Sequence, residues 1–264
     1  MAQDGRHPLR GLLVAQFLGA FNDNAWKLFV AFLAIRAATA GTGAAGAALE
    51  ALSQRRTTLV FVVFTLPLVL FSLPAAVLAD RISKRTLIVV LKGAELVLMA
   101  SGGLVLWLAP GSVALPLAVL ALMGAHSALF SPAKYGILPE LLPHERLSRG
   151  NALIETTTMI AIILGSAAGG VLRDLSGERL WITGAILAGL AAAGFAASLA
   201  VPRVAPAGAG GRVGETVRTA WGAIRGERVL WLTTLGLTFF WGMASLLGQD
   251  ILVYAKSVLG LSDT

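Results

Sequence analysis

The segment Phe21-Asn22-Asp23-Asn24-Ala25-Trp26-Lys27 interrupts an otherwise apolar run that extends from Leu12 to Ile35. A helix of about 20 apolar residues crosses the roughly 30 Å hydrocarbon core of a bilayer, so the run predicts a membrane-spanning helix with Asp23 near the midplane. A charge at that depth costs roughly 2.5–3.5 kcal/mol on insertion scales. We therefore expect Asp23 to face other helices or a water-filled cavity, and we expect that cavity to be the functional site.

The charge of Lys27 offers a second interpretation of this segment. Lys27 follows Asp23 by four positions, which places both on one face of a helix, with the acid in the favourable N-terminal position. The two charges would then neutralise each other and have a structural role only. The sequence leaves both interpretations open.

The composition is that of a membrane protein. Hydrophobic residues make up 56% of the chain and charged residues 13%, with a mean hydropathy of +0.79, whereas about a quarter of the residues in soluble domains are charged. The chain has no cysteine, which excludes disulfides and cysteine-ligated metal sites, and we expect no cofactor or metal. Its net charge of +7 favours basic loops at one membrane face over a nucleic-acid partner, because the basic residues cluster at alternate ends of the apolar runs.

Six further apolar runs are long enough, or nearly so, to cross a bilayer. They extend over residues 58–79, 86–109, 113–130, 151–172, 180–201 and 229–254. Runs of this length predict helices, because backbone polar groups in lipid must be satisfied within the segment. The predicted fold is an all-α membrane protein with a six-helix N-terminal bundle over 1–201, a cytoplasmic linker over 202–227, and a seventh transmembrane helix within 228–264. The linker contains a predicted amphipathic helix, in which Val217, Trp221 and Ile224 recur at helical spacing.

The distribution of Lys and Arg predicts the orientation in the membrane. The N-terminus and the links after the second, fourth and sixth apolar runs carry most of the basic residues, whereas the other links carry few. By the positive-inside rule, the basic set is cytoplasmic, and so is the N-terminus. The high content of Ala, Gly and Arg is typical of a GC-rich bacterial genome, so we expect a multi-pass protein of the bacterial inner membrane.

A charged turn, Asp80-Arg81-Ile82-Ser83-Lys84-Arg85, follows the second apolar run. Its acid and bases are suited to lock neighbouring helices through ion pairs and helix ends, or they form only a basic cytoplasmic loop. The turn resembles the signature Gly-x-x-x-Asp-Arg-x-Gly-Arg-Lys/Arg of the major facilitator superfamily, although Ala76 and Ser83 replace its glycines. The resemblance implies a transporter built from two six-helix halves, with a conformational lock at the four matching residues, Asp80, Arg81, Lys84 and Arg85.

Three other stretches resemble the lysophospholipid transporter branch of that superfamily. They are residues 15–25, residues 150–155 and Phe130-Ser131-Pro132-Ala133-Lys134-Tyr135-Gly136-Ile137-Leu138-Pro139-Glu140. The resemblance recurs from Tyr254 to Ser262. It implies import of lysophospholipids, such as lysophosphatidylethanolamine, from the outer to the cytoplasmic leaflet for reacylation, by alternating access. Because this branch includes proteins fused to phospholipid-remodelling acyltransferases, it also implies an acyltransferase or acyl-carrier-protein ligase as a partner or a fused domain.

A lysophospholipid needs a charged site for its headgroup and an apolar route for its acyl chain. Lys134 is a compact cation suited to the phosphate, and Asp23 is suited to the ethanolamine ammonium, with Asn22 and Asn24 offering hydrogen bonds. The alternative for Lys134 is a cytoplasmic anchor whose ammonium reaches the interface. The alternative for Glu155 is the capping of a helix N-terminus. The predicted substrate-binding residues are Asn22, Asp23, Asn24, Lys27, Lys134 and Glu155, and no catalytic residue is predicted.

Other polar and small residues within the apolar runs have simpler expected roles. Lys92 and Glu95 are three positions apart and are expected to pair as a structural couple. For His126, a hydrogen-bonded packing role is favoured over a proton relay. The Gly165-x-x-x-Gly169 pattern allows helix backbones to pack closely, or to slide past each other during alternating access.

Other functions compete with this interpretation. The acyltransferase pattern His-x-x-x-x-Asp, the nucleotide-binding loop Gly-x-x-x-x-Gly-Lys-Ser/Thr and the hydrolase elbow Gly-x-Ser-x-Gly are all missing from the chain, so an enzyme is not expected. A fused acyltransferase beyond residue 264 stays open. A facilitator of another small solute or drug is the main alternative, and a non-transporting fragment or scaffold is the second. Whether the reading frame continues past Thr264 separates these alternatives most cheaply.

Overall fold

The computed structural model describes residues 8–40, 46–205 and 213–257, with the backbone alone at 213–217, 245–246 and 248–257. All regular elements in these described ranges are helices, which confirms the predicted all-α class. The chain divides into two compact units, Met1–Gly210 and Gly211–Thr264.

The first unit contains seven of the described α-helices and one short 3-10 turn. In chain order these are α1 (Arg10–Thr39), α2 (Ala47–Arg81), α3 (Lys84–Leu108), α4 (Ala114–Gly136), α5 (Leu138–Leu141), η1 (His144–Arg146), α6 (Leu147–Ser176) and α7 (Trp181–Leu199). The second unit contains α8 (Val213–Gly226) and α9 (Arg228–Ser257). The short α5 and η1 lie in the link between two long helices, where no helix was predicted.

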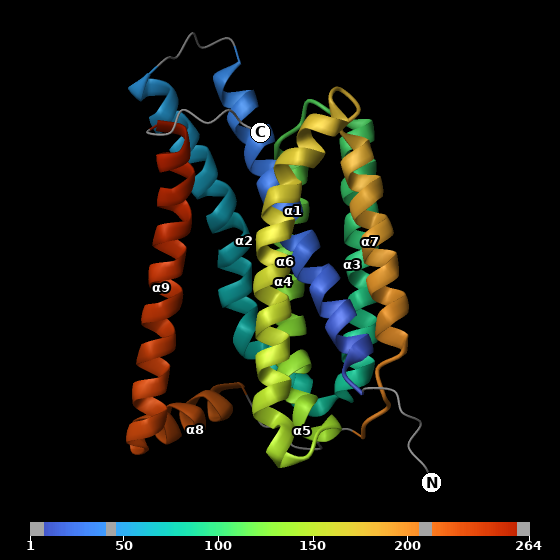
Figure 1. The fold of residues 1–264 in the computed structure, drawn as a ribbon, viewed down its shortest axis with the longest axis vertical. Helices are drawn as coiled ribbons and strands as arrows, with labels where there is room; N and C mark the ends of the chain where they lie inside the picture. Colours follow the sequence, from blue (N-terminus) through green and yellow to red (C-terminus); the bar gives the residue numbers. More distant parts are fainter. Residues whose placement is uncertain (1–7, 41–45, 206–212, 258–264) are drawn as a thin grey trace. The chain divides into compact units, whose positions relative to one another are not determined.

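Helix α1 is the element that contacts most of the others in the first unit. It packs against α6, α7, α2 and α4, while α2 packs along α4 and α3 along α7 (Figure 1). The contact with α6 is close because Gly165 and Gly169 have no side chain. A Cβ atom on Gly165 would lie 2.5 Å from the carbonyl oxygen of Phe21, and one on Gly169 would lie 2.8 Å from that of Ala25. The predicted close packing at these glycines is therefore confirmed.

Two apolar clusters fill the space between the helices. The first surrounds Trp26 and Phe29 of α1, both fully buried, and includes Met99 of α3, Leu120 of α4 and Leu187 of α7. The second lies where several helix ends meet, and its members include Leu12, Ile88, Ile137, Ile154 and Val201. Leu12 belongs to the second cluster and Trp26 to the first. The polar side chains of α1 within residues 16–24 therefore lie at the level between the two clusters.

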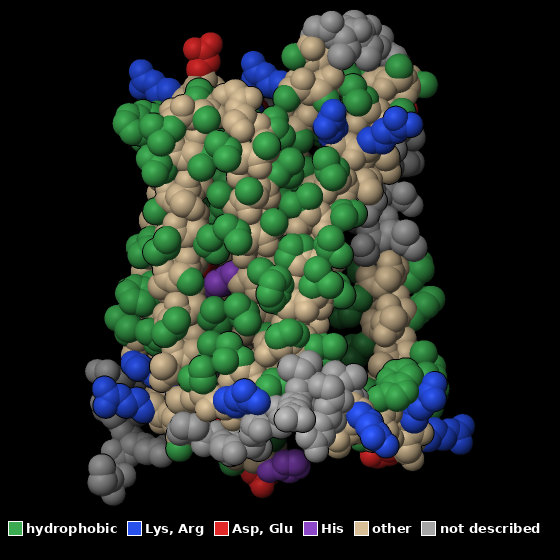
Figure 2. Space-filling model, turned by 180° about the vertical axis from the view of Figure 1, so that it is seen from behind, with side chains coloured by type: hydrophobic (Ala, Val, Ile, Leu, Met, Phe, Trp, Pro, Cys, Tyr) green, Lys and Arg blue, Asp and Glu red, His purple; other side chains and the backbone are tan. Residues whose placement is uncertain are grey.

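The outer surfaces of the long helices are apolar. Five described helices or helix pairs are long and apolar enough to span a membrane, namely Ala47–Arg81, Lys84–Leu108, Ala114–Leu141, His144–Ser176 and Trp181–Leu199. At most 44% of the apolar segment of each is buried inside the protein. Figure 2 shows hydrophobic side chains along the middle of the helices and Lys and Arg at the helix ends. This distribution is that of a multi-pass membrane protein.

Helix α1 forms as predicted, but it is not one of the five apolar spans. The polar residues from Asn22 to Asn24, together with Lys27, interrupt its apolar run, so no 18-residue segment of α1 is as apolar as those of the five spans. Thirteen residues of α1 are buried against neighbouring helices, so protein rather than lipid surrounds much of this helix. A helix surrounded by protein does not need an apolar surface to cross a bilayer.

Two helices extend well beyond the apolar runs that predicted them. Helix α2 begins at Ala47 rather than near residue 58, so Arg55 and Arg56 lie within the helix and not in a loop. The residues before the apolar run are mostly strong helix formers, which continue the helix past the hydrocarbon boundary. Helix α4 continues through Pro132 to Gly136, which keeps Lys134 on the helix.

The second unit contains the predicted linker helix and the helix of the last apolar run. Helix α8 forms at the predicted position. The rings of Trp221 in α8 and Trp231 in α9 meet edge to face with centroids 6.3 Å apart, and the guanidinium of Arg225 lies 4.6 Å from the Trp221 ring centroid. Helix α9 is confirmed as a helix; that it spans the membrane stays a prediction, because many of its side chains lie outside the described residues.

Candidate functional site

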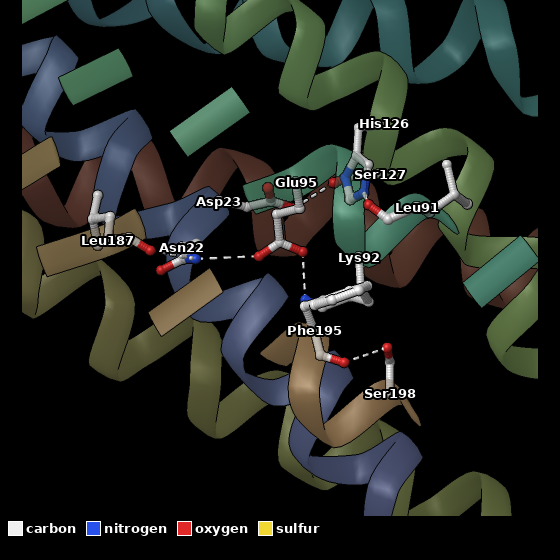
Figure 3. Close-up of polar contacts among 10 residues, drawn as sticks. All are labelled: Asn22, Asp23, Leu91, Lys92, Glu95, His126, Ser127, Leu187, Phe195 and Ser198. Atoms are coloured by element: carbon white, nitrogen blue, oxygen red, sulfur yellow. Dashed lines mark hydrogen bonds and ion pairs between the residues drawn. The ribbon is translucent and has the colours of Figure 1, made fainter. Parts of the chain in front are cut away.

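Asp23 points from α1 toward α4. The hydroxyl of Ser127 in α4 donates a hydrogen bond to Oδ2 of Asp23, and Figure 3 shows the two side chains facing each other. No described residue donates a hydrogen bond to the other carboxylate oxygen. The expectation that Asp23 faces other helices is met by this contact. A carboxylate with one bound and one free oxygen is able to accept a further donor.

Lys27 does not pair with Asp23. Its ammonium donates to Oδ1 of Asn24 at 2.8 Å and lies 4.9 Å and 5.1 Å from the ring centroids of Phe61 and Phe64 in α2. Aromatic faces attract cations, and more strongly where water is excluded. The direct ion pair that the spacing allowed is therefore not formed, and the Asp23 carboxylate has no cationic hydrogen-bond partner among the described residues.

Asn22 faces α3 and α7, on another side of α1 from Asp23. Its amide nitrogen donates to Oε1 of Glu95 at 3.1 Å and to the carbonyl oxygen of Leu187 at 3.2 Å. Glu95 in turn forms an ion pair with Lys92, which confirms the predicted pairing. Figure 3 shows this chain of contacts from Leu187 through Asn22 and Glu95 to Lys92. Both N–H groups of Asn22 are engaged, so they do not point to a substrate in this conformation.

A second polar cluster lies at the end of α4. The hydroxyl of Tyr135 donates to Oε1 of Glu155 in α6, and the ammonium of Lys134 lies 4.8 Å from the Tyr135 ring centroid. The structure thus brings two of the predicted site residues, Lys134 and Glu155, to the same tyrosine. Tyr135 was not singled out in the sequence, although its position directly after Lys134 was a usable signal.

A third polar contact joins α1 to α6 and was also missed. The amide of Gln16 donates to the hydroxyl of Thr157, and the hydroxyl of Thr158 donates to the amide oxygen of Gln16 at 2.8 Å. Gln16 is 2% exposed. The signal for this contact was a glutamine within an apolar run and three successive threonines after Glu155.

The remaining polar residues have local roles. Nδ2 of Asn24 donates to the carbonyl oxygen of Ala20 in the same helix at 2.8 Å. Nε2 of His126 lies 2.9 Å from the carbonyl oxygen of Leu91, an arrangement in which the ring contacts the neighbouring helix backbone. This hydrogen bond is what a packing histidine makes.

The charged turn after α2 contacts two other segments. Lys84 forms an ion pair with Glu140 of α5. The guanidinium of Arg85 donates to the carbonyl oxygens of Leu199 and Val201 at the end of α7, at 3.5 Å and 3.4 Å. Asp80 and Arg81 are the last two residues of α2. These contacts connect the beginning of α3 to α5 and to the end of α7, while the role of the turn as a lock stays a prediction.

The arrangement defines a class of protein: a multi-pass helical membrane protein with charged groups between its helices. Such groups are expensive in a bilayer and mark paths for polar or charged substrates. A model of the Major Facilitator Superfamily matches residues 12–264. The chain belongs to the Major Facilitator Superfamily, a family of transporters.

Two bacterial relatives extend this comparison. A protein of Cronobacter sakazakii named Lysophospholipid transporter LplT is 31% identical over 267 residues, covering 97% of this chain and 59% of the relative. A protein of Salmonella gallinarum with the same name is 32% identical over 263 residues, covering 96% of this chain and 58% of the relative. The chain therefore spans somewhat more than half the length of these relatives. The comparison with solved structures found no match.

Proposed function

We propose that the chain supplies the first part of a lysophospholipid transporter. The observation that carries the proposal is the similarity of nearly the whole chain to relatives named for that transport. In the proposed organisation, residues 1–201 form the first six-helix bundle, residues 202–227 form a cytoplasmic linker, and residues 228–264 begin the second bundle. The proposal concerns the chain together with any sequence that follows it in its gene.

In the proposed binding mode, the zwitterionic headgroup lies between α1, α4 and α6. The free oxygen of Asp23 accepts the ammonium of lysophosphatidylethanolamine, while Ser127 holds the other oxygen. Lys134 attracts the phosphate, and Tyr135 keeps Glu155 in place beside it. Lys27 and Asn24 add a cation and an amide near Asp23. A carboxylate and a lysine on separate helices suit a ligand that carries both charges.

The proposed direction of transport is from the outer to the cytoplasmic leaflet of a bacterial inner membrane, with the N-terminus in the cytoplasm. The basic residues gathered at the cytoplasmic links support this orientation. The imported lipid would then be reacylated by an acyltransferase or acyl-carrier-protein ligase. Asp80, Arg81, Lys84 and Arg85 are proposed to stabilise one conformation of the transport cycle; the contacts of Lys84 and Arg85 with other helix ends support this role.

Uptake of labelled lysophosphatidylethanolamine tests the proposed function directly. Spheroplasts that lack their own lysophospholipid transporter are supplied with the complete reading frame that contains this chain, and internal diacyl lipid is measured. We expect uptake well above that of the empty vector, together with no efflux of cationic drugs. Drug efflux without lipid uptake would assign the chain to a facilitator of other solutes. Neither activity in a correctly inserted protein would favour a non-transporting scaffold.

A further inference from the structure

A buried polar chain ties the middle of α1 to α3 and α7. Asn22 is fully buried, and its amide nitrogen contacts both Glu95 and the carbonyl oxygen of Leu187. Its amide oxygen has no hydrogen-bond partner among the described residues. Both contacts of the nitrogen are with acceptors, so the amide has only one favourable orientation. Asn22 therefore fixes α1 to two neighbours at a single level of the bundle.

The acceptor for Asn22 is itself held by an ion pair. The side chains of Lys92 and Glu95 are 0% and 2% exposed. One oxygen of Glu95 contacts Lys92 and the other accepts a hydrogen bond from the Asn22 amide, so both carboxylate oxygens have a partner. A buried ion pair contributes little net stability, because desolvation offsets the attraction. It is favourable only when the two groups lie in one particular arrangement. This chain of contacts is therefore better suited to setting a position than to strengthening the fold.

Two glycines provide the space that the ion pair occupies. A Cβ atom on Gly19 of α1 would lie 3.0 Å from Nζ of Lys92, and one on Gly194 of α7 would lie 3.0 Å from its Cε. Gly19 precedes Asn22 by one helical turn, on the same side of α1. The faces of α1 and α7 thus leave room for Lys92, and a side chain at either glycine would crowd the end of the lysine.

The position of Asn22 sets the direction of its neighbour. Successive residues of a helix are rotated by about 100°, so anchoring residue 22 toward α3 and α7 fixes where residue 23 points. We propose that Asn22, Glu95 and Lys92 are positioning residues, which hold α1 in the rotation that directs Asp23 toward Ser127 and the headgroup. This inference rests on the proposed role of Asp23 in binding the ammonium of the substrate.

Two double variants separate the effect of the hydrogen bond between Asn22 and residue 95 from the effect of the charges of Lys92 and Glu95. Lys92→Met/Glu95→Gln removes both charges but keeps an oxygen that accepts the Asn22 amide. Lys92→Met/Glu95→Leu removes the same charges and the acceptor as well. Replacement of a buried pair by apolar groups of similar size is commonly tolerated, so both variants are expected to fold. They differ at residue 95 alone, where the glutamine oxygen accepts the Asn22 amide and leucine does not.

The readout is the ratio of KM for lysophosphatidylethanolamine to KM for lysophosphatidylglycerol, which has no ammonium. We expect the Gln variant to keep the wild-type ratio. We expect the Leu variant to raise it about tenfold, because an Asp23 carboxylate that turns away loses its hydrogen bond to the ammonium of lysophosphatidylethanolamine. Thr183→Val is the control, since it removes another buried polar contact, between α6 and α7. It is expected to leave the ratio unchanged.

Thiol labelling gives a second readout that needs no transport. The chain contains no cysteine, so Asp23→Cys in each double variant reports where position 23 faces. We expect a changed rate of reaction with a water-soluble maleimide only in the Leu variant. Equal behaviour of the two double variants in both assays, including failure of both to fold, would overturn the positioning role. If wild-type protein imports neither lipid, the proposed function fails, and the labelling alone decides the inference.

Discussion

At the residue scale, the important feature is a carboxylate that is held by a hydroxyl group and forms no direct ion pair. Asp23 accepts one hydrogen bond from Ser127, while the nearby Lys27 is occupied by Asn24 and two phenylalanine rings. An ion pair within α1 would have cancelled the charge. A hydroxyl orients the carboxylate without bringing a cation to it, which leaves an oxygen to accept an ammonium group.

Ser127→Ala tests this orientation. We expect the variant to insert and fold normally and to raise the KM for lysophosphatidylethanolamine about three- to tenfold, because the Asp23 carboxylate loses the donor that fixes it. The measurement is the concentration dependence of lipid uptake. Ser101→Ala is the matched control, since the Ser101 hydroxyl donates only to the Leu98 carbonyl of its own helix. A wild-type KM in Ser127→Ala would show that Ser127 does not orient the carboxylate.

The sequence predicts a side-chain contact only when the two residues lie close together along the chain. The Lys92–Glu95 pair was predictable because its members are three positions apart on one helix. The contact of Asp23 with Ser127 was not, because it joins residues 104 positions apart. For the same reason, Asn22 was grouped with Asp23 as a substrate residue, although adjacent residues of a helix point in different directions.

At the element scale, α1 packs against most of the other long helices of the first unit, and glycines of α6 line one of these contacts. Gly165→Ala places a methyl group 2.5 Å from the Phe21 carbonyl oxygen, which neither backbone can accommodate without moving. We expect a loss of about 1–3 kcal/mol in stability. The measurement is thermal unfolding of the purified protein in detergent.

The control for this prediction is Gly189→Ala on α7. A Cβ atom at Gly189 would meet no atom within 4 Å, so the substitution is expected to be neutral, or to stabilise the helix slightly through the better propensity of alanine. Equal unfolding temperatures for the two variants would mean that α1 and α6 do not pack as closely as described.

The existence of the helices was predictable from the sequence, and their ends were less so. Apolar runs report where a helix lies in hydrocarbon, and not where its hydrogen bonding stops, so the start of α2 at Ala47 was missed. The short α5 contains only Leu138–Leu141, and four residues are too few for a periodic pattern to be recognised. The burial of α1 was predicted from its charges rather than from its hydropathy, and the charges were the better guide.

At the scale of the whole molecule, the predicted orientation assigns each link between helices to one face of the membrane. The link after α3 contains Gly111, and the link before α6 contains His144; both residues are exposed. Single cysteines at these two positions are therefore accessible to reagents from whichever side they face. With the N-terminus in the cytoplasm, residue 111 lies outside and residue 144 inside.

We expect a membrane-impermeant maleimide to label Gly111→Cys in intact spheroplasts, and His144→Cys only after the membrane is permeabilised. The wild-type chain, which has no cysteine, is the background control. The reverse pattern would place the N-terminus outside and would remove the proposed direction of import.

In the proposed mechanism, Asp23 carries its charge between the helices to meet the headgroup. The most direct measurement is uptake of lysophosphatidylethanolamine by Asp23→Asn, compared with wild type at equal amounts of inserted protein. The substitution keeps the size of the side chain and an oxygen that accepts the Ser127 hydroxyl, and removes only the charge. We predict that uptake is abolished while insertion is unchanged. Uptake at the wild-type rate would contradict the account.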